Sequence, residues 1–184
     1  TKSGTKFYEN ISSTDSQGLI GNNYTDSLNL LANKDDYRYN IISAPGLVYS
    51  AANHTTAINL MISNTANRGD AIAIVDLELY GSTPTATVST AVSIDSSYAA
   101  AYWPWCQLKD PDTGNLVWVP ASTILPGVYA YNDKIGETWF APAGISKGGL
   151  NIVTQAERKL PQADRDTLYN GKVNPIATFP GKGI

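Results

Sequence analysis

The chain has 184 residues, of which 42% are hydrophobic and 16% are charged. This length fits one domain, or one domain with an appendage, and the apolar content is sufficient for a sizeable core. The net charge of −3 leaves no basic excess to neutralise phosphates, so direct binding of nucleic acid is not expected. No apolar run reaches the roughly 18 residues that a membrane helix requires, so membrane insertion is not expected either.

The charges and the cysteine add two further constraints. Residues 1–133 carry a net charge of −6, and residues 134–184 carry +3. An acidic body with a basic tail would steer copies of the chain into head-to-tail association, although chance explains the asymmetry equally well in a weakly charged chain. Cys106 is the only cysteine, so an intrachain disulfide is excluded and synthesis in a reducing cytoplasm is the default expectation.

The N-terminal part of the chain predicts an irregular segment followed by a folded domain. Residues 1–25 are rich in Ser, Thr, Gly and Asn without periodicity, which predicts a loop or the tail of a preceding domain. We expect an α/β domain over residues 26–184. It begins with a short helix over residues 26–33, for which Asp26 is a suitable N-cap, and continues with a strand over residues 37–43.

The next stretch predicts a helix and a buried strand. Pro45-Gly46 is expected to end the preceding strand. Residues 48–65 place apolar side chains at helical spacing on one face, and Arg68-Gly69-Asp70 is the expected break after that helix. Residues 71–79 are almost continuously apolar at their start, which is typical of a strand buried on both faces of a parallel sheet.

The middle of the chain predicts a helix, a hairpin and a second helix. A weak helix is expected over residues 84–93, and an aromatic strand over residues 98–108. Residues 110–114 have turn composition, so residues 116–119 are expected to pair back as a hairpin. A further helix is expected over residues 122–133.

The last third predicts shorter elements. Residues 139–149 are rich in proline and glycine and predict a loop, followed by a short strand over residues 150–154. Pro161 at a first helical position predicts a helix over residues 161–168, and a last strand is expected over residues 176–179. The order of elements predicts an α/β (α+β) fold with a mixed β-sheet flanked by helices.

The sequence offers little for catalysis or ligand binding. His54 is the only histidine and has no nucleophile motif near it, and one histidine with one cysteine cannot complete a zinc site. Residues 110–114 lack the ligands of a calcium loop, and no phosphate-binding glycine motif is present. We therefore predict no catalytic residue, no metal site and no cofactor.

An aromatic block is the most informative feature of the sequence. Tyr98-Ala-Ala-Ala-Tyr-Trp-Pro-Trp105 holds four large aromatic residues within eight positions. In a strand, Trp103 and Trp105 share one face and Tyr102 lies on the other. Core packing explains part of this block, while Pro104 favours an edge or a strand end, where exposed aromatic residues meet a partner.

An ordered series of such motifs resembles the contractile tail sheath proteins of myoviruses. Each motif is weak alone, but their order over residues 37–184 is specific. The motifs are Ile41-Ile-Ser-Ala-Pro-Gly46, Tyr98 to Trp105, Val119-Pro-Ala-Ser122, Gly127-Val-Tyr-Ala-Tyr-Asn-Asp133, Trp139-Phe-Ala-Pro-Ala-Gly144, Leu168-Tyr-Asn170, Val173-Asn-Pro-Ile176 and Phe179-Pro-Gly181. In the family a further strand and domain follow Gly183, and neither is found here, so residues 26–184 are expected to be a C-terminally shortened sheath core domain.

The resemblance implies a structural role without an enzymatic activity. Sheath subunits polymerise around a tail tube and contract to drive the tube through the host envelope for genome delivery. The implied partners are other copies of the subunit, the tail tube protein, and the baseplate and tail terminator proteins. The implied location is the virion, after synthesis in the host cytoplasm. The candidate subunit-contact residues are Trp103, Trp105, Tyr131, Trp139, Arg158 and Lys159.

Two alternatives remain from the residues alone. Alternating strands and helices are also found in nucleotide-binding and hydrolase-like enzyme domains, because a fold does not fix a function. The aromatic block also suits a binding module that presents aromatic side chains to a ligand such as a carbohydrate.

Overall fold

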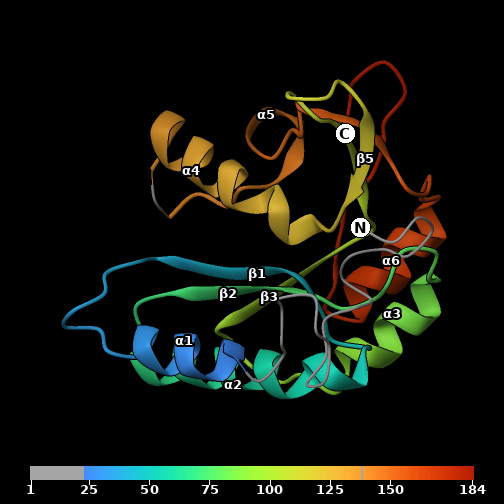
Figure 1. Cartoon of the computed structure of the whole chain (residues 1–184). Helices are drawn as coiled ribbons and strands as arrows, with labels where there is room; N and C mark the ends of the chain where they lie inside the picture. The colour runs from blue at the N-terminus through green and yellow to red at the C-terminus, as the bar shows by residue number, and fades with distance from the viewer. Residues whose placement is uncertain (1–22, 138) are drawn as a thin grey trace.

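The computed structural model of the chain describes residues 23–137 and 139–184 and consists of two layers. In Figure 1 a parallel sheet runs across the middle, with two helices below it and a smaller layer above it. Most of the predicted N-terminal tail, residues 1–25, lies outside the described residues. The predicted α/β class is confirmed, with the parallel and the antiparallel pairings in two separate sheets rather than in one mixed sheet.

The first layer is a four-stranded sheet in the order β1-β2-β3-β7, and each pairing is parallel. Its strands are β1 (Ile41–Val48), β2 (Ile72–Asp76), β3 (Ala99–Trp103) and β7 (Asn174–Pro175). Four of the five residues of β2 are buried, as the continuous apolar run predicted. The central strand is therefore covered on both faces.

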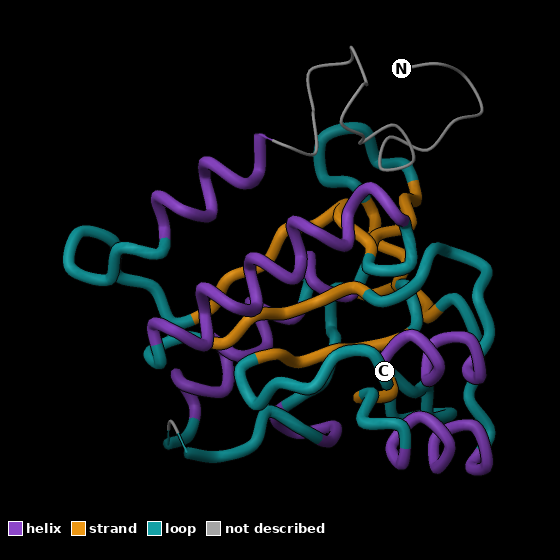
Figure 2. Tube along the Cα trace, turned by 90° about the horizontal axis from the view of Figure 1, so that it is seen from below, coloured by secondary structure: helices purple, strands orange, loops and turns teal. Residues whose placement is uncertain are grey.

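Four helices complete the first layer. They are α1 (Asn23–Leu31), α2 (Ala52–Arg68), α3 (Pro84–Ala91) and α6 (Gln162–Asn170). In Figure 2, which views the molecule from below, α2 lies in front of the strands and runs roughly along them, with α1 beside it. α2 buries Ile58 and Met61 in the main core. Gly69 ends α2 in a left-handed conformation with φ of 75°, which explains the break predicted there.

Helices α3 and α6 pack on each other at the end of the sheet (Figure 1). A Cβ atom at Gly171, which directly follows α6, would lie 2.5 Å from Cγ2 of Val88 in α3. The close approach of the two helices therefore depends on the absence of a side chain at residue 171.

The second layer contains a three-stranded antiparallel sheet in the order β5-β4-β6. Its elements are β4 (Cys106–Lys109), β5 (Leu116–Val119), β6 (Val153–Ala156), η2 (Ala121–Thr123), α4 (Leu125–Ile135) and α5 (Gly144–Lys147). A second core, which includes Ile74, Cys106, Leu125, Val128 and Leu150, fills the space between this layer and the parallel sheet. The predicted hairpin is confirmed by the antiparallel pairing of β4 with β5.

Two predicted boundaries in the first half of the chain are wrong. Helix α1 already begins at Asn23, so Asp26 lies in its first turn and is not its N-cap. Strand β1 continues through Pro45-Gly46, because an irregular pairing between Ser43 and Val48 absorbs both residues, with Gly46 at φ of 102°.

The aromatic strand and the last strand also differ from the prediction. The stretch from residue 98 to 108 is two strands in different sheets, which separate at the cis peptide bond between Trp103 and Pro104. The last strand is β7, two residues before the predicted range of 176–179, and Phe179 forms only an isolated bridge with Gly183. The predicted loop over residues 139–149 contains the short helix α5.

Candidate assembly surface

A buried carboxylate fixes the second layer to the parallel sheet. Asp76, the last residue of β2, is 5% exposed, and its side chain accepts hydrogen bonds from Ser122 N at 3.0 Å and from Ser122 Oγ at 2.5 Å. Burial raises the pKa of Asp76 to about 6, and the two bonds from Ser122 act in the opposite direction. The start of η2 is therefore held at the end of the central strand.

Two further contacts join the layers. The hydroxyls of Tyr102 in β3 and Tyr129 in α4 lie 2.7 Å apart, and burial raises the pKa of Tyr102 well above its ordinary value. Glu157, which follows β6, accepts from the backbone N–H of Gly81 at 2.6 Å and of Trp105 at 3.3 Å. The second layer is thus held by specific polar contacts in addition to its own core.

His54 and Cys106 are buried in the fold, and Asp110 stabilises a hairpin turn. His54 is 2% exposed, and its Nδ1 accepts a hydrogen bond from Val48 N at 2.9 Å. Cys106 is fully buried, and burial raises the pKa of its thiol to about 12, which disfavours the nucleophilic thiolate. The Asp110 carboxylate accepts from Thr113 and from Asp112 N within the hairpin turn, and these bonds lower its pKa.

The described residues contain neither a metal-binding cluster nor a membrane-spanning helix. No group of three or more His, Cys, Asp or Glu side chains in this part of the chain is placed to hold a metal ion. Within the same residues, no helix has the length and apolar character needed to cross a membrane.

Two of the six predicted contact residues are interior side chains. Trp103 is 2% exposed and Trp105 is 3% exposed, and both belong to the main core. The indole N–H of Trp105 donates to the carbonyl of Glu78 at 2.9 Å, and the guanidinium of Arg158 lies 5.9 Å from the centre of the Trp103 ring. Neither tryptophan reaches the surface of the chain, so core packing explains this end of the aromatic block.

The other predicted contact residues reach solvent. Tyr131 on α4 is 49% exposed, and Trp139 is 75% exposed. Lys159 is exposed and Arg158 is half-buried. The ring of Trp139 lies 4.3 Å from that of Phe140, centre to centre, and Lys147 Nζ lies 3.8 Å from the centre of Phe140. Trp139 therefore packs against the Phe140 ring, which in turn contacts a cation, while most of the Trp139 side chain stays exposed.

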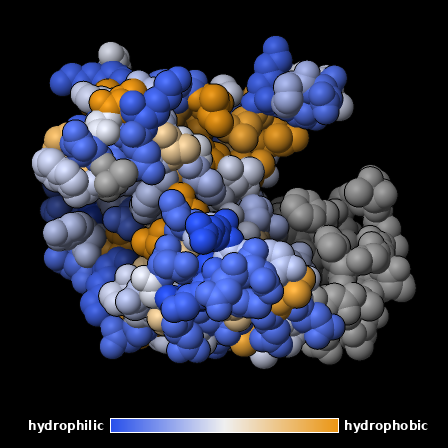
Figure 3. Space-filling view, turned by 90° about the vertical axis from the view of Figure 1, so that its left-hand side faces the viewer, coloured by the Kyte–Doolittle hydropathy of each residue, from blue (hydrophilic) through white to orange (hydrophobic). Residues whose placement is uncertain are grey.

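Sequence reasoning missed further exposed apolar side chains of the second layer. These are Leu116, Val117, Ile135, Ile145 and Ile152. On the face shown in Figure 3, the largest hydrophobic area lies in the upper half, at the height of this layer. The helical spacing of α4 could have indicated Ile135. Leu125, Val128 and Asn132 form the buried stripe of this helix, and Tyr131 and Ile135, four residues apart, form a second apolar stripe.

The sequence matches the family described as phage tail sheath protein central domain over residues 18–184. The chain belongs to the phage tail sheath family. This family membership confirms the resemblance inferred from the ordered motifs, and it gives no support to the enzyme or the ligand-binding alternative.

Three curated relatives carry the name tail sheath protein. The protein of Vibrio phage KVP40 is 36% identical over 67 residues, which are 36% of this chain and 10% of the relative. The protein of Enterobacteria phage T4 is 35% identical over 66 residues, again 36% of this chain and 10% of the relative. The protein of Salmonella phage ViI is 29% identical over 90 residues, which are 49% of this chain and 14% of the relative. The chain thus aligns with only a small part of each relative's length.

Proposed function

We propose that this chain is the core of a structural subunit of a contractile tail sheath. The subunit polymerises around the tail tube and contracts to drive the tube through the host envelope during genome delivery. The observation that carries this proposal is the match to the sheath family over residues 18–184, nearly the whole chain. Contraction requires interfaces with two stable arrangements rather than bond chemistry, and burial of His54 and Cys106 in the fold is consistent with a non-enzymatic role.

The proposed subunit contacts lie on the second layer and on the basic segment that follows it. Trp139 and Tyr131 expose large aromatic surface, which is enriched at the centre of protein interfaces. Lys159 and Arg158 add positive charge from the basic tail of the chain. Trp103 and Trp105 are 2% and 3% exposed, so the proposal assigns them to the core and not to the contact surface.

The proposed partners follow from the family. They are further copies of the subunit, the tail tube protein, and the baseplate and tail terminator proteins, in the virion after synthesis in the host cytoplasm. Direct contact with nucleic acid is not part of the proposal, since the net charge is −3, and neither is membrane insertion.

Electron microscopy of a sheath protein that contains this chain tests the proposal. We expect tubular polymers, and we expect Trp139→Ala to shorten or abolish them. Tyr169→Ala is the matched control, because both side chains are aromatic and 75% exposed, while Tyr169 lies outside the proposed contact. A protein that stays monomeric under all assembly conditions would contradict the proposed function.

A further inference from the structure

The parallel sheet has an open edge at the first half of β3. On one side Ala99, Ala100 and Ala101 pair with β2, but the pairing with β7 on the other side involves only Tyr102 and Trp103. Among the described residues, the three alanines therefore have a strand neighbour on one side only. Natural edges are usually protected by charged side chains, prolines or bulges, and three alanines provide none of these.

The backbone of this edge is oriented to accept another strand. Tyr98 O accepts from Ala73 N of β2, whereas Trp103 O accepts from Ile176 N on the opposite side. Because backbone groups alternate along a strand, Ala99 and Ala101 direct theirs away from β2. Ala101 O accepts a hydrogen bond from the side-chain amide of Asn174 at 3.1 Å, in the position where the N–H group of a further strand would lie.

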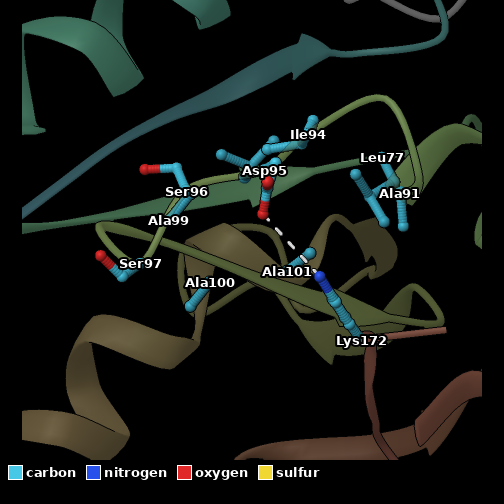
Figure 4. A pocket seen from close by; sticks show the side chains of 11 residues that line it. Leu77, Ala91, Ile94, Asp95, Ser96, Ser97, Ala99, Ala100, Ala101 and Lys172 are labelled. Atoms are coloured by element: carbon cyan, nitrogen blue, oxygen red, sulfur yellow. Dashed lines mark ion pairs between the residues drawn. The ribbon is translucent and has the colours of Figure 1, made fainter. Parts of the chain in front are cut away.

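A pocket of about 280 Å³ lies beside this edge (Figure 4). Its apolar walls include Val75, Leu77 and Ile94, and the alanines leave it unfilled. Asp95 and Lys172 stand at its rim as an ion pair with an N–O distance of 3.8 Å, and their side chains are 96% and 82% exposed. An exposed ion pair at this distance contributes little energy, so it would not prevent an apolar side chain from entering the pocket.

A second open edge is β5, the outer strand of the antiparallel sheet. Asp110 N donates to Asn115 O, and in an antiparallel ladder the hydrogen-bonded pairs then recur at Val117 and Val119. Leu116 and Trp118 therefore direct their backbone groups outward. Leu116 is also 56% exposed, and no residue of Leu116–Val119 is charged.

We propose that β5 of one subunit pairs with the open edge of β3 in a second copy, with Leu116 placed in the pocket beside Ala99. The inference rests on the proposed self-assembly. Charge favours this partner, because Asp110 and Asp112 at the tip of the β4–β5 hairpin would be attracted by Lys172 at the pocket rim. Asp95, also at the rim, would repel them. Because the two edges are different surfaces, each pairing leaves one edge free on each copy, and an open chain of subunits results.

Cross-linking between two single-site variants of the 184-residue chain tests the pairing. Ala99→Cys and Leu116→Cys are mixed and treated with a short bis-maleimide. The buried native Cys106 should stay unmodified, because its thiol is fully covered. Neighbouring strands bring opposite Cβ atoms to about 5 Å, so we expect the mixed pair to cross-link at least about tenfold more than Ala99→Cys mixed with Leu30→Cys. Leu30 is the matched control, since it is 57% exposed on α1.

Each other outcome overturns the inference in a recognisable way. Preferential cross-linking of Leu116→Cys with itself would show that two β5 edges pair. Preferential cross-linking of Ala99→Cys with itself would show that two β3 edges pair. A mixed yield no higher than the Leu30 control would show that these edges do not dock.

Sedimentation velocity separates this inference from the proposed function. We expect Ala99→Lys and Leu116→Lys each to remove concentration-dependent association of the chain, and a mixture of the two to form dimers and nothing larger, because one competent edge survives on each. Association that persists in both variants would overturn the edge pairing and leave sheath assembly intact. A wild-type chain that never associates would overturn the pairing and count against self-assembly as well.

Discussion

The two layers of this molecule differ in where they place their apolar side chains. The parallel layer buries them: β2 is covered on both faces, and Trp103 and Trp105 lie in its core. The second layer has a core too, yet seven of the twelve large hydrophobic residues exposed in the described part of the chain fall between residues 116 and 152. The proposed function requires a subunit that stays folded while its contacts change. The difference teaches that the parallel layer holds the larger core, whereas the second layer has most of the exposed apolar surface on which the proposed subunit contacts lie.

Truncating a core tryptophan would break this comparison most directly. Trp103→Ala should lower the free energy of unfolding by about 3–5 kcal/mol, because it leaves a large cavity in the main core. Urea unfolding followed by circular dichroism measures the change. A loss below about 1 kcal/mol would show that Trp103 is not a core residue, and the contact role predicted from the sequence would regain its basis.

The joint between the layers should respond to pH through Asp76. Its pKa of about 6 in the folded chain exceeds the ordinary 3.8, so the folded state holds a proton that the unfolded state releases between these values. Stability from this group is therefore greatest below pH 4 and decreases as the pH rises through 6, by about 3 kcal/mol in total.

Asp76→Asn removes this titration. Unfolding free energies of both proteins measured from pH 4 to pH 7 should diverge, with the wild type losing stability relative to the variant as the pH rises. Parallel curves would mean that the Asp76 carboxyl titrates alike in the folded and unfolded chain.

The Tyr102–Tyr129 contact sharpens the comparison at smaller magnitude. Tyr102→Phe removes one hydrogen bond between the layers and should cost about 0.5–1.5 kcal/mol. Double-mutant analysis with Tyr129→Phe should show that the two losses are not additive, since both remove the same bond. Additive losses would indicate that each hydroxyl has a separate partner.

The smallest effect on stability is expected on the exposed stripe of α4. Tyr131→Ala should change the free energy of unfolding by no more than about 0.5 kcal/mol, although an aromatic ring is lost, because the ring is half exposed. The same variant should weaken subunit association in sedimentation experiments. A large loss of stability with unchanged association would reverse the roles of the two layers.

The sequence predicted the buried elements better than the exposed surface, for a physical reason. Residues 71–79 and the helical spacing within residues 48–65 reflect burial against many neighbours, and the structure confirms both elements. The sequence correctly placed Trp103 and Trp105 on one side, in the main core, and Tyr102 on the other, against the second core. It did not show that the chain passes from one sheet to another at Pro104, because that change depends on pairing with distant strands. The exposure of Trp139 likewise could not be predicted from the neighbouring sequence, because it depends on the packing of Phe140 against Trp139 and against Lys147 of α5.

The contact between α3 and α6 has a consequence for how sheath sequences vary. Val88 fills the space that a side chain at residue 171 would need. A Cβ atom at residue 171 would lie 2.5 and 2.6 Å from the two methyl carbons of Val88, which would have to shift. Across homologous chains, a side chain at residue 171 should therefore coincide with a smaller residue at 88. Within this chain Val88→Ala should rescue Gly171→Ala, so that the two positions vary as a compensating pair.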